Sequence, residues 1–302
     1  MRKIFMAAAI CGAPFNGQAA QLASFEHVYA VLDSKTVEAI ARSDYIREQF
    51  SGVIDKTTLS DEGHYRSRFI QGRHNYFEYL APAELDLDGP PAAVGIVGIG
   101  LDSETVGGTE KLAEALKSTG LPFEIRTFHK TFGDHAVDWS KGLALRATLD
   151  GDTEKGSLPQ AEIFSAEYLP SYFLIPEANK PPSTDPDDIS LARYHQRDYA
   201  GRLMADLSGA SLDITRDDWQ VYRAMLGTAG YRLGQTGGGA RATADVDFRF
   251  HFVTQGHVGL RRLTFKLTSA PGKEHVEILG HSRLIVGPGA TAVWTFGPQD
   301  PS

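Results

Sequence analysis

The stretch FEHVYAVLDSKTV, residues 25–37, decides how the chain begins to fold. Its first nine residues are rich in β-branched and aromatic side chains and predict a strand. Asp33 or Ser34 then offers a side-chain oxygen that can accept the unpaired N–H groups at the start of a helix. The apolar stripe of that helix is formed by Val37, Ile40, Ala41, Ile46 and Phe50.

Three further strands are expected directly after this helix. They are predicted at 52–59, 65–70 and 75–80, and Gln71-Gly72-Arg73 is typical of a tight turn between the last two. The order strand-helix-strand-strand-strand is therefore complete within about 60 residues, a common size for a supersecondary unit.

An internal echo indicates that this unit is repeated. LDSKTV at residues 32–37 is matched by LDSETV at residues 101–106, and each copy follows an apolar strand. We therefore expect a second helix over 103–118, followed by strands at 122–129, at 143–148 and within 162–175. A helix-start pattern shared by chance is the alternative explanation.

The rest of the chain predicts a linker and a third module. Residues 176–188 are proline-rich, acidic and without periodicity, as linkers are. Beyond them, a strand, a helix over 215–227 and several hairpins follow. The expected division is a signal peptide at 1–23, paired modules at 24–176, a linker and helix at 177–200, and a third α+β module at 201–302.

The N-terminus and the composition limit the classes of function. Arg2 and Lys3, a short apolar run and Gly17-Gln18-Ala19 predict a secretory signal, so we expect a secreted or periplasmic protein with no membrane association after cleavage. The mature chain then has no cysteine, which excludes thiol catalysis and disulfides. The net charge of −8 over 302 residues, without a long basic run, argues against a nucleic-acid partner.

His27 and Glu78 are the residues whose chemistry stands out. His27 lies in the first predicted strand, and Glu78 interrupts the aromatic run NYFEYL of the fourth. If these strands are neighbours, an imidazole and a carboxylate share one concave face, and both are common ligands of first-row metals. The alternative is that Glu78 faces solvent while Phe77 and Tyr79 point inward.

These features resemble the vicinal oxygen chelate superfamily, which includes glyoxalases, extradiol dioxygenases and bleomycin-resistance proteins. The resemblance rests on the repeated module, on HVYAVLD at 27–33, on Thr57-Thr58, on the strand and turn at 65–72, on YFE at 76–78 and on Glu167-Tyr168-x-Pro170. It is closest to an uncharacterised glyoxalase-like family. It implies an α+β fold in which βαβββ modules form half-open, barrel-like sheets around a small ligand.

The resemblance also implies a divalent metal, Mn, Fe, Ni or Zn, held by His27 and Glu78. Matching the two copies of the unit puts Ile96 opposite His27 and Leu174 opposite Glu78, so the second module supplies no ligand there. The third ligand is expected to be His129, with Glu167 and His251 as alternatives. The ligand-binding residues implied are Tyr29, Tyr65, Phe69, Tyr76, Glu167 and Tyr168.

Two functions follow from this interpretation. In the first, the metal acts as a Lewis acid and Glu78 moves a proton, which suits a lyase, an isomerase or a ring-opening dioxygenase. In the second, the protein binds or sequesters a small molecule without metal or catalysis. Both take a small molecule as partner and allow a homodimer. The completeness of the ligand set distinguishes them, since a catalytic metal needs about three protein ligands.

Overall fold

The computed structural model describes residues 21–60, 63–87, 94–132, 135–145, 161–199, 201–254 and 257–297. Residues 1–20 of the predicted signal peptide (1–23) lie outside this part of the chain, whereas Ala23 is described and is buried in the core. None of the helices in the described ranges is both long and apolar enough to cross a membrane.

The first sheet is built by residues 24–168. Its strands are β1 (Ser24–Val31), β2 (Gly52–Ser60), β3 (Gly63–Gln71), β4 (Tyr76–Leu80), β5 (Leu85–Leu87), β6 (Val97–Asp102), β7 (Phe123–Phe132), β8 (His135–Leu145) and β9 (Ala161–Tyr168). The short helices among them are α1 (Ser34–Arg42), η1 (Ile46–Phe50), η2 (Pro82–Glu84), α2 (Gly108–Leu116) and η3 (Lys117–Thr119).

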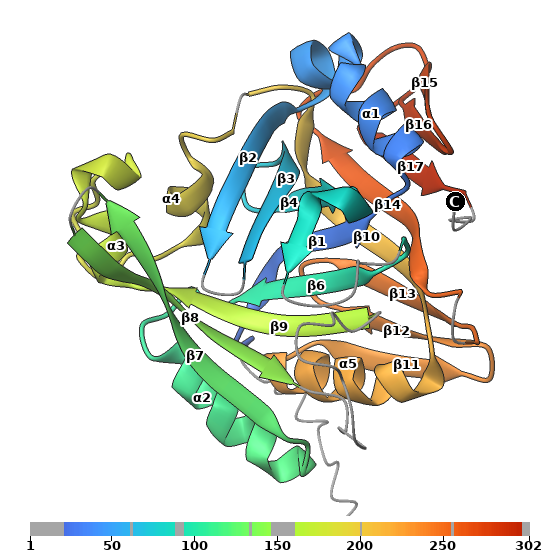
Figure 1. The fold of residues 1–302 in the computed structure, drawn as a ribbon. Helices are drawn as coiled ribbons and strands as arrows, with labels where there is room; N and C mark the ends of the chain where they lie inside the picture. Colours follow the sequence, from blue (N-terminus) through green and yellow to red (C-terminus); the bar gives the residue numbers. More distant parts are fainter. Residues whose placement is uncertain are drawn as a thin grey trace, which may run out of the picture.

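The strand order of this sheet confirms the expected repeat. It runs β2-β3-β4-β1-β6-β9-β8-β7, with β5 beside β3 (Figure 1). In each half, the first strand of the unit pairs in parallel with the fourth, as β1 does with β4 and β6 with β9. The two halves join through an antiparallel pairing of β1 with β6. Two βαβββ units thus lie edge to edge in one open, mixed sheet.

The two helices of this sheet begin differently. Asp33 caps α1 as predicted, because its side chain accepts the Thr36 N–H at 3.0 Å. The expected start of the second helix at Ser103 is wrong, because α2 begins only at Gly108. Its first N–H groups are accepted by Glu167 of β9, from Gly107 and Thr109, both at 2.8 Å. The second copy of the Leu-Asp-Ser pattern therefore does not cap its helix.

The remainder of the chain forms the covering helices and a second sheet. The covering helices are α3 (Pro170–Phe173), η4 (Pro176–Ala178) and α4 (Leu191–His195). The second sheet contains β10 (Met204–Ile214), β11 (Arg232–Thr236), β12 (Gly239–Thr243), β13 (Asp247–Phe252), β14 (Gly259–Leu267), β15 (His275–Leu279), β16 (Ser282–Val286) and β17 (Thr291–Phe296), with α5 (Arg216–Ala229) after β10.

The second sheet repeats the plan of the first in one of its halves. Its order is β11-β12-β13-β10-β14-β17-β16-β15, and β10 pairs in parallel with β13 as β1 does with β4. The other half differs, because β14 pairs with β17 antiparallel, whereas β6 pairs with β9 in parallel. The hairpins expected as decoration of a third module are the strands β14–β17, which complete this sheet without a helix after β14 and without a parallel pairing of their first and last strands.

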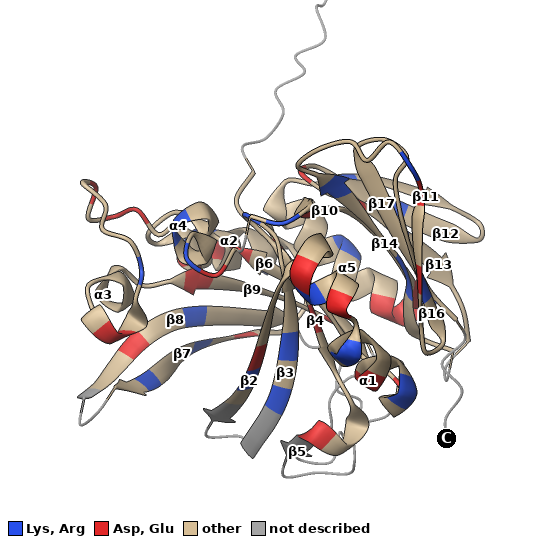
Figure 2. Cartoon of the chain, turned by 90° about the horizontal axis from the view of Figure 1, so that it is seen from above, with Lys and Arg blue, Asp and Glu red and all other residues tan. Residues whose placement is uncertain are grey.

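The apolar core lies between the two sheets, where α1 and α5 are also inserted (Figure 2). Aromatic side chains meet across it: Phe25 packs edge-on against Phe248 at 5.3 Å between ring centroids, and Phe77 against Trp294 at 5.9 Å. The Tyr222 hydroxyl of α5 donates to the Glu162 carbonyl of β9 at 2.7 Å. The two sheets therefore share one continuous core.

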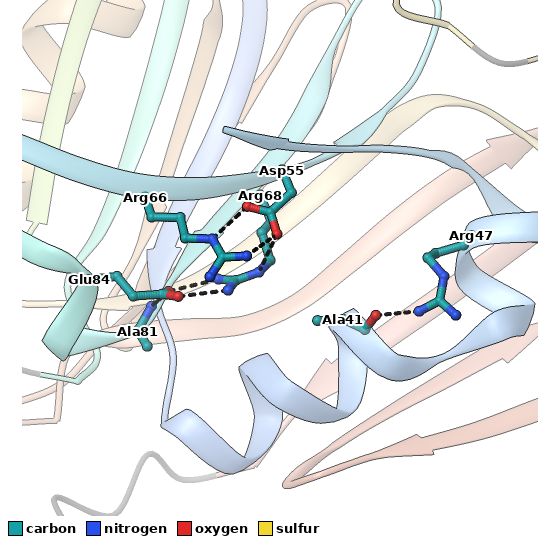
Figure 3. Close-up of polar contacts among 7 residues, drawn as sticks. All are labelled: Ala41, Arg47, Asp55, Arg66, Arg68, Ala81 and Glu84. Atoms are coloured by element: carbon teal, nitrogen blue, oxygen red, sulfur yellow. Dashed lines mark hydrogen bonds and ion pairs between the residues drawn. The ribbon is translucent and has the colours of Figure 1, made fainter. Parts of the chain in front are cut away.

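An ion-pair network fixes β2 and β3 to the chain after β4 (Figure 3). Arg66 donates to both carboxylate oxygens of Asp55, at 2.8 and 2.6 Å, and the buried Arg68 donates to both oxygens of Glu84 at 2.7 Å. Glu84 also accepts the Ala81 N–H at 2.9 Å. Arg68 and Glu84 are both largely buried, so we assign this bidentate pair a structural role.

The shared core predicts that the sheets unfold together. Phe77→Ala is expected to lower the free energy of unfolding by about 3–5 kcal/mol, because Phe77 is fully buried against Trp294 and Phe296. Denaturant unfolding followed by tryptophan fluorescence and circular dichroism should give one shared transition. Ile278→Ala, at a side chain that is 68% exposed, is the control, with a change within about 0.5 kcal/mol. Two separate transitions would contradict a common core.

Candidate functional site

The concave face of the first sheet collects the side chains that the sequence singled out. Side chains alternate along a strand, so His27 and Tyr29 of β1 point to this face while Val28 points to the core. On β4, Tyr76 and Glu78 do the same, and they pair with His27 and Tyr29 respectively. The expected convergence of His27 and Glu78 is therefore found, and the interpretation in which Glu78 simply faces solvent is wrong.

His27 is held tightly at this position. Its ring is 5% exposed and stacks on Tyr76 with 4.5 Å between the ring centroids. Its Nε2 atom lies 3.9 Å from Glu78 Oε2, and its Nδ1 atom lies 3.3 Å from Glu26 Oε2. Both nitrogens of the imidazole thus face carboxylates.

Two glycines of β6 make room for these rings. A Cβ atom at Gly98 would lie less than 3.0 Å from the ring of Tyr29, and one at Gly100 would lie as close to the ring of His27. The aromatic side chains of β1 therefore lie across the neighbouring strand β6. The small residues of VGIGLD permit this close approach.

The second module does contribute a carboxylate, which the sequence comparison missed. Tyr29 pairs with Gly98 at the centre of the sheet. On the neighbouring parallel strands, Glu78 pairs with Tyr29, and Glu162 pairs with Gly98. Glu162 is therefore the counterpart of Glu78, and the Tyr29 hydroxyl donates to it at 2.6 Å. The assignment of Leu174 was wrong, since Leu174 follows α3 and is 74% exposed. Counting residues along the parallel strand pairs would have identified Glu162.

A second group of buried acids lies next to His27. An irregularity in β1 between Phe25 and His27 brings Glu26 beside His27, and Glu26 also accepts a hydrogen bond from the Tyr168 hydroxyl. Asp102 of β6 is completely buried, and neither of its carboxylate oxygens has a hydrogen-bond partner among the described residues. Burial, with Glu26 as the largest charge contribution, raises the pKa of Asp102 well above its usual value.

Glu78 has the electrostatic character of a functional carboxylate. Burial raises the pKa of Glu78, and the neighbouring His27 opposes this shift in part. Burial also raises the pKa of Tyr29, and the Glu162 carboxylate adds to the effect. The centre of the concave face therefore favours the protonated form of Glu78 unless a positive charge is added.

Residues 170–195, called here the covering segment, close one side of this face. The Tyr194 ring stacks on Tyr168 at 3.9 Å between centroids, and His195 packs edge-on against Tyr76 at 5.4 Å. Lys180 anchors the segment by donating to the Tyr194 carbonyl at 2.6 Å and to Asp198 at 2.7 Å. Residues expected to form a linker are thus packed against the sheet, with α3 and α4 beside its concave side (Figures 1 and 2).

The two edges of the first sheet approach each other. Burial lowers the pKa of Lys130 of β7 to about 7, and Lys56 of β2 and Lys180 contribute to this shift. Because β2 and β7 are opposite edges of the sheet, the electrostatic interaction of Lys56 with Lys130 requires the sheet to curl. Lys130 also lies over the Trp139 ring, at 3.9 Å from its centroid.

The other predicted site residues are distributed as follows. Phe69 packs against Tyr76 at 5.5 Å between centroids and so lines the concave face with it. Tyr65 lies in β3, and its side chain is outside the described part of the structure. Tyr168 is buried beneath Tyr194, and Glu167 is buried as the cap of α2, so neither is open to a ligand.

The structure does not support His129 as a third metal ligand. It is exposed on β7, where it forms an ion pair with Asp138 at 2.7 Å. His251 lies in the second sheet and contacts the Ser211 hydroxyl at 3.0 Å.

The residues of the concave face do not fit a metal ion as they stand. Among the described residues, no three His, Asp or Glu side chains are gathered closely enough to hold one. The donor arrangement explains this, because the imidazole of His27 is shared between Glu26 and Glu78, and Glu162 is engaged by the Tyr29 hydroxyl. We therefore derive no chemical step through a metal.

A hollow lies elsewhere on the molecule. It has a volume of about 730 Å³ and is bordered by α5, β11 and the residues after α2. Its lining includes Trp219, Gln235 and Arg223, and the Trp219 indole N–H donates to Gln235. Because Arg223 is its one charged lining residue, we do not assign the binding site to it.

Comparison with known proteins gives a family and a fold. A model described as a family of unknown function, DUF5829, matches residues 25–296. No curated protein matches the sequence significantly. The strand order described above, with its repeated βαβββ units, is the α+β arrangement expected from the sequence.

Several solved structures are similar over most of the chain. The 2,3-dioxygenase LapB from Pseudomonas sp. KL28 is 14% identical, with 93% of each chain covered and a TM-score of 0.42. The Mn(II)-bound glyoxalase from Novosphingobium aromaticivorans is 8% identical, with 92% of this chain and 83% of that chain covered and a TM-score of 0.44. At these values the similarity carries no argument about activity.

The buried Asp102 predicts a pH-dependent stability. Because the folded-state pKa of Asp102 is raised, its stabilising contribution is present below its unfolded pKa of about 3.9 and is lost as pH rises through the folded value. Asp102→Asn should therefore gain stability relative to the wild type between pH 4 and pH 8, in urea unfolding experiments. Asp187→Asn, at an exposed carboxylate, should show no such gain. Parallel pH curves for wild type and Asp102→Asn would contradict the assignment.

Proposed function

The chain belongs to the DUF5829 family, and we propose that it binds a small organic molecule carrying an amine or another cationic group on the concave face of its first sheet. The observation that carries the proposal is the convergence of His27 on the buried Glu78, with Glu26 and Glu162 on the same face. We propose binding without a metal, and the protein's export, which its N-terminal residues predict, is part of the same proposal.

The charge of the site selects the class of ligand. Glu26 and Glu78 flank the buried His27 imidazole, and Glu162 lies on the same face, bound by the Tyr29 hydroxyl. A buried carboxylate is stabilised by a positive charge or by hydrogen-bond donors, and the raised pKa of Glu78 indicates that the protein alone does not supply enough of either. A ligand amine would supply both.

The walls of the site favour a ligand with an apolar or aromatic body. Tyr76 and Phe69 form one wall, and Phe164 lies 5.4 Å from the His27 ring on the other side. Aromatic rings beside carboxylates are a common way to bind organic cations, because the faces of the rings attract positive charge. We therefore expect an aromatic or alkyl amine of modest size.

His27 and Tyr29 act as positioning residues in this proposal. His27 lies between Glu26 and Glu78 and limits the movement of the Glu78 carboxylate, while Tyr29 holds Glu162 through its hydroxyl. The covering segment then limits access, since Tyr194 and His195 pack on rings of the same face. Release of this segment would open the site to solvent.

The test is a binding titration with matched probes. Benzylamine, benzyl alcohol and benzoate share one ring and differ in charge, so isothermal titration calorimetry should rank the amine first. Glu78→Gln should weaken benzylamine binding by about tenfold or more, the expected loss for one hydrogen bond to a charged group. The alcohol should be little affected.

Glu48→Gln is the control, because it removes one exposed carboxylate far from this face. Equal binding of benzoate and benzylamine, or equal effects of Glu78→Gln and Glu48→Gln, would refute the proposal.

A metal-dependent enzyme is the second candidate, and one observation favours it. His27, Glu78 and Glu162 lie around the central pair Tyr29–Gly98. A movement of the Tyr29 ring that broke its hydrogen bond to Glu162 would free that carboxylate to act as a third metal ligand. Purified wild-type protein analysed by plasma mass spectrometry is expected to contain well under one Mn, Fe, Ni or Zn ion per chain. One ion per chain that is lost in both His27→Ala and Glu78→Ala would establish this second function instead.

A further inference from the structure

We propose that the outer face of the second sheet is a second binding site, for a linear acidic oligosaccharide of the polyuronate type. The evidence is a row of residues that are directly paired across six neighbouring strands. In order from β12 to β16, the row consists of Arg241, Arg249, Ser211, Arg262, Thr295 and Arg283.

The register places all six side chains on one face. Directly paired residues in neighbouring strands point to the same side of a sheet. On β13, Phe248 and Phe250 are buried in the core, so Arg249 between them points outward. The same alternation on β14 buries Leu263 and leaves Arg262 exposed. The row therefore lies on the face away from the first sheet, and it spans about 24 Å at roughly 4.8 Å per strand.

This row is the structural counterpart of the site on the first sheet. Ser211 pairs with Arg249 and Arg262 as Tyr29 pairs with Glu78 and Gly98. Arg249 therefore stands in the position of Glu78. The two sheets therefore carry opposite charges at this one position.

The charge of the row runs against that of the whole chain. The chain carries a net charge of −8, yet four of the six residues in the row are arginines. Arg241 and Arg249 share Asp247, at 2.5 and 3.3 Å, and their side chains remain 57% and 61% exposed. Arg262 and Arg283 are exposed and form no ion pair with any described residue. Like charges in such a row destabilise the sheet, so a ligand that neutralises them would bind favourably.

The spacing indicates a chain of anionic groups rather than a single anion. Arg249, Arg262 and Arg283 lie on every second strand, about 10 Å apart at the backbone, and hydroxyl residues lie on the strands between them. An extended polyuronate offers the same alternation, because carboxylates of alternate sugars face one side and hydroxyl groups lie between them. Arginine binds carboxylates through two parallel hydrogen bonds.

Single-stranded nucleic acid fits the row less well. Proteins that bind it combine positive charge with aromatic side chains on which the bases stack. The residues between the arginines are Ser211 and Thr295, and the paired row on one side contains Asp247, Gly209, Thr264 and Val293. On the other side, the one ring that contacts this row among the described residues is that of His251, whose Nε2 atom lies 3.0 Å from the Ser211 hydroxyl.

The experiment is a titration of the full chain with a defined hexagalacturonate, at low and at physiological salt. Binding is expected, and it should weaken as salt increases. The double variant Arg262→Ser/Arg283→Ser should lower the affinity by about tenfold or more. Both residues are exposed, so this variant should keep the wild-type unfolding transition.

The control is Lys35→Ser/Lys111→Ser, which removes the same charge from exposed sites on α1 and α2. It should change the affinity less than twofold. Absence of hexagalacturonate binding, or equal losses in the two double variants, would overturn the proposal. Hexathymidylate that binds as tightly as hexagalacturonate would overturn the assignment to a polyuronate. Neutral maltohexaose should not bind, and its binding would also overturn the assignment to a polyuronate.

Discussion

The close approach of Tyr29 to Gly98 is the constraint on which the first site depends. These residues pair at the centre of the sheet, where the first and second modules meet. Because Gly98 has no side chain, the ring of Tyr29 can lie across β6 and reach Glu162 with its hydroxyl. His27 lies across Gly100 in the same way. A side chain at either glycine would displace these rings, and the arrangement of carboxylates around them would change.

Two of the buried carboxylates on this face lower the stability of the fold when they are charged. Asp102 and Glu78 are carboxylates whose pKa values are raised by burial, and such groups destabilise a fold when they ionise. By contrast, the buried Glu167 accepts two backbone N–H groups and stabilises the start of α2. A fold retains costly buried acids where function requires them, which is the physical basis for placing the ligand beside Glu78.

The second sheet shows how one architecture supports two different surfaces. Its core face resembles that of the first sheet, with large aromatic residues such as Phe248, Phe265 and Trp294 fully buried. Its outer face is open and carries arginines, whereas the first sheet is covered by residues 170–195 and carries carboxylates. Packing of the core requires only that alternate residues be apolar, so the residues between them are free to differ.

The sequence by itself determined the strand and helix order of the first module, placed its helix cap at Asp33 or Ser34, and singled out His27 and Glu78, whose shared face depended on the pairing of their strands. The order and the cap follow from short-range rules: side-chain alternation in strands, apolar periodicity in helices and local capping. It also indicated the repeat, through the Leu-Asp-Ser echo.

Only the tertiary structure decided the residues that complete the site and how β14–β17 join the second sheet. Glu162, Glu167 and the covering segment act through contacts with residues distant in the chain, such as Tyr29, Gly107 and Tyr76. The antiparallel pairing of β14 with β17 has no counterpart in the first sheet. Local patterns specify which way a side chain points, but they do not specify what it meets. That depends on strand order and register, which are set by packing of the whole sheet.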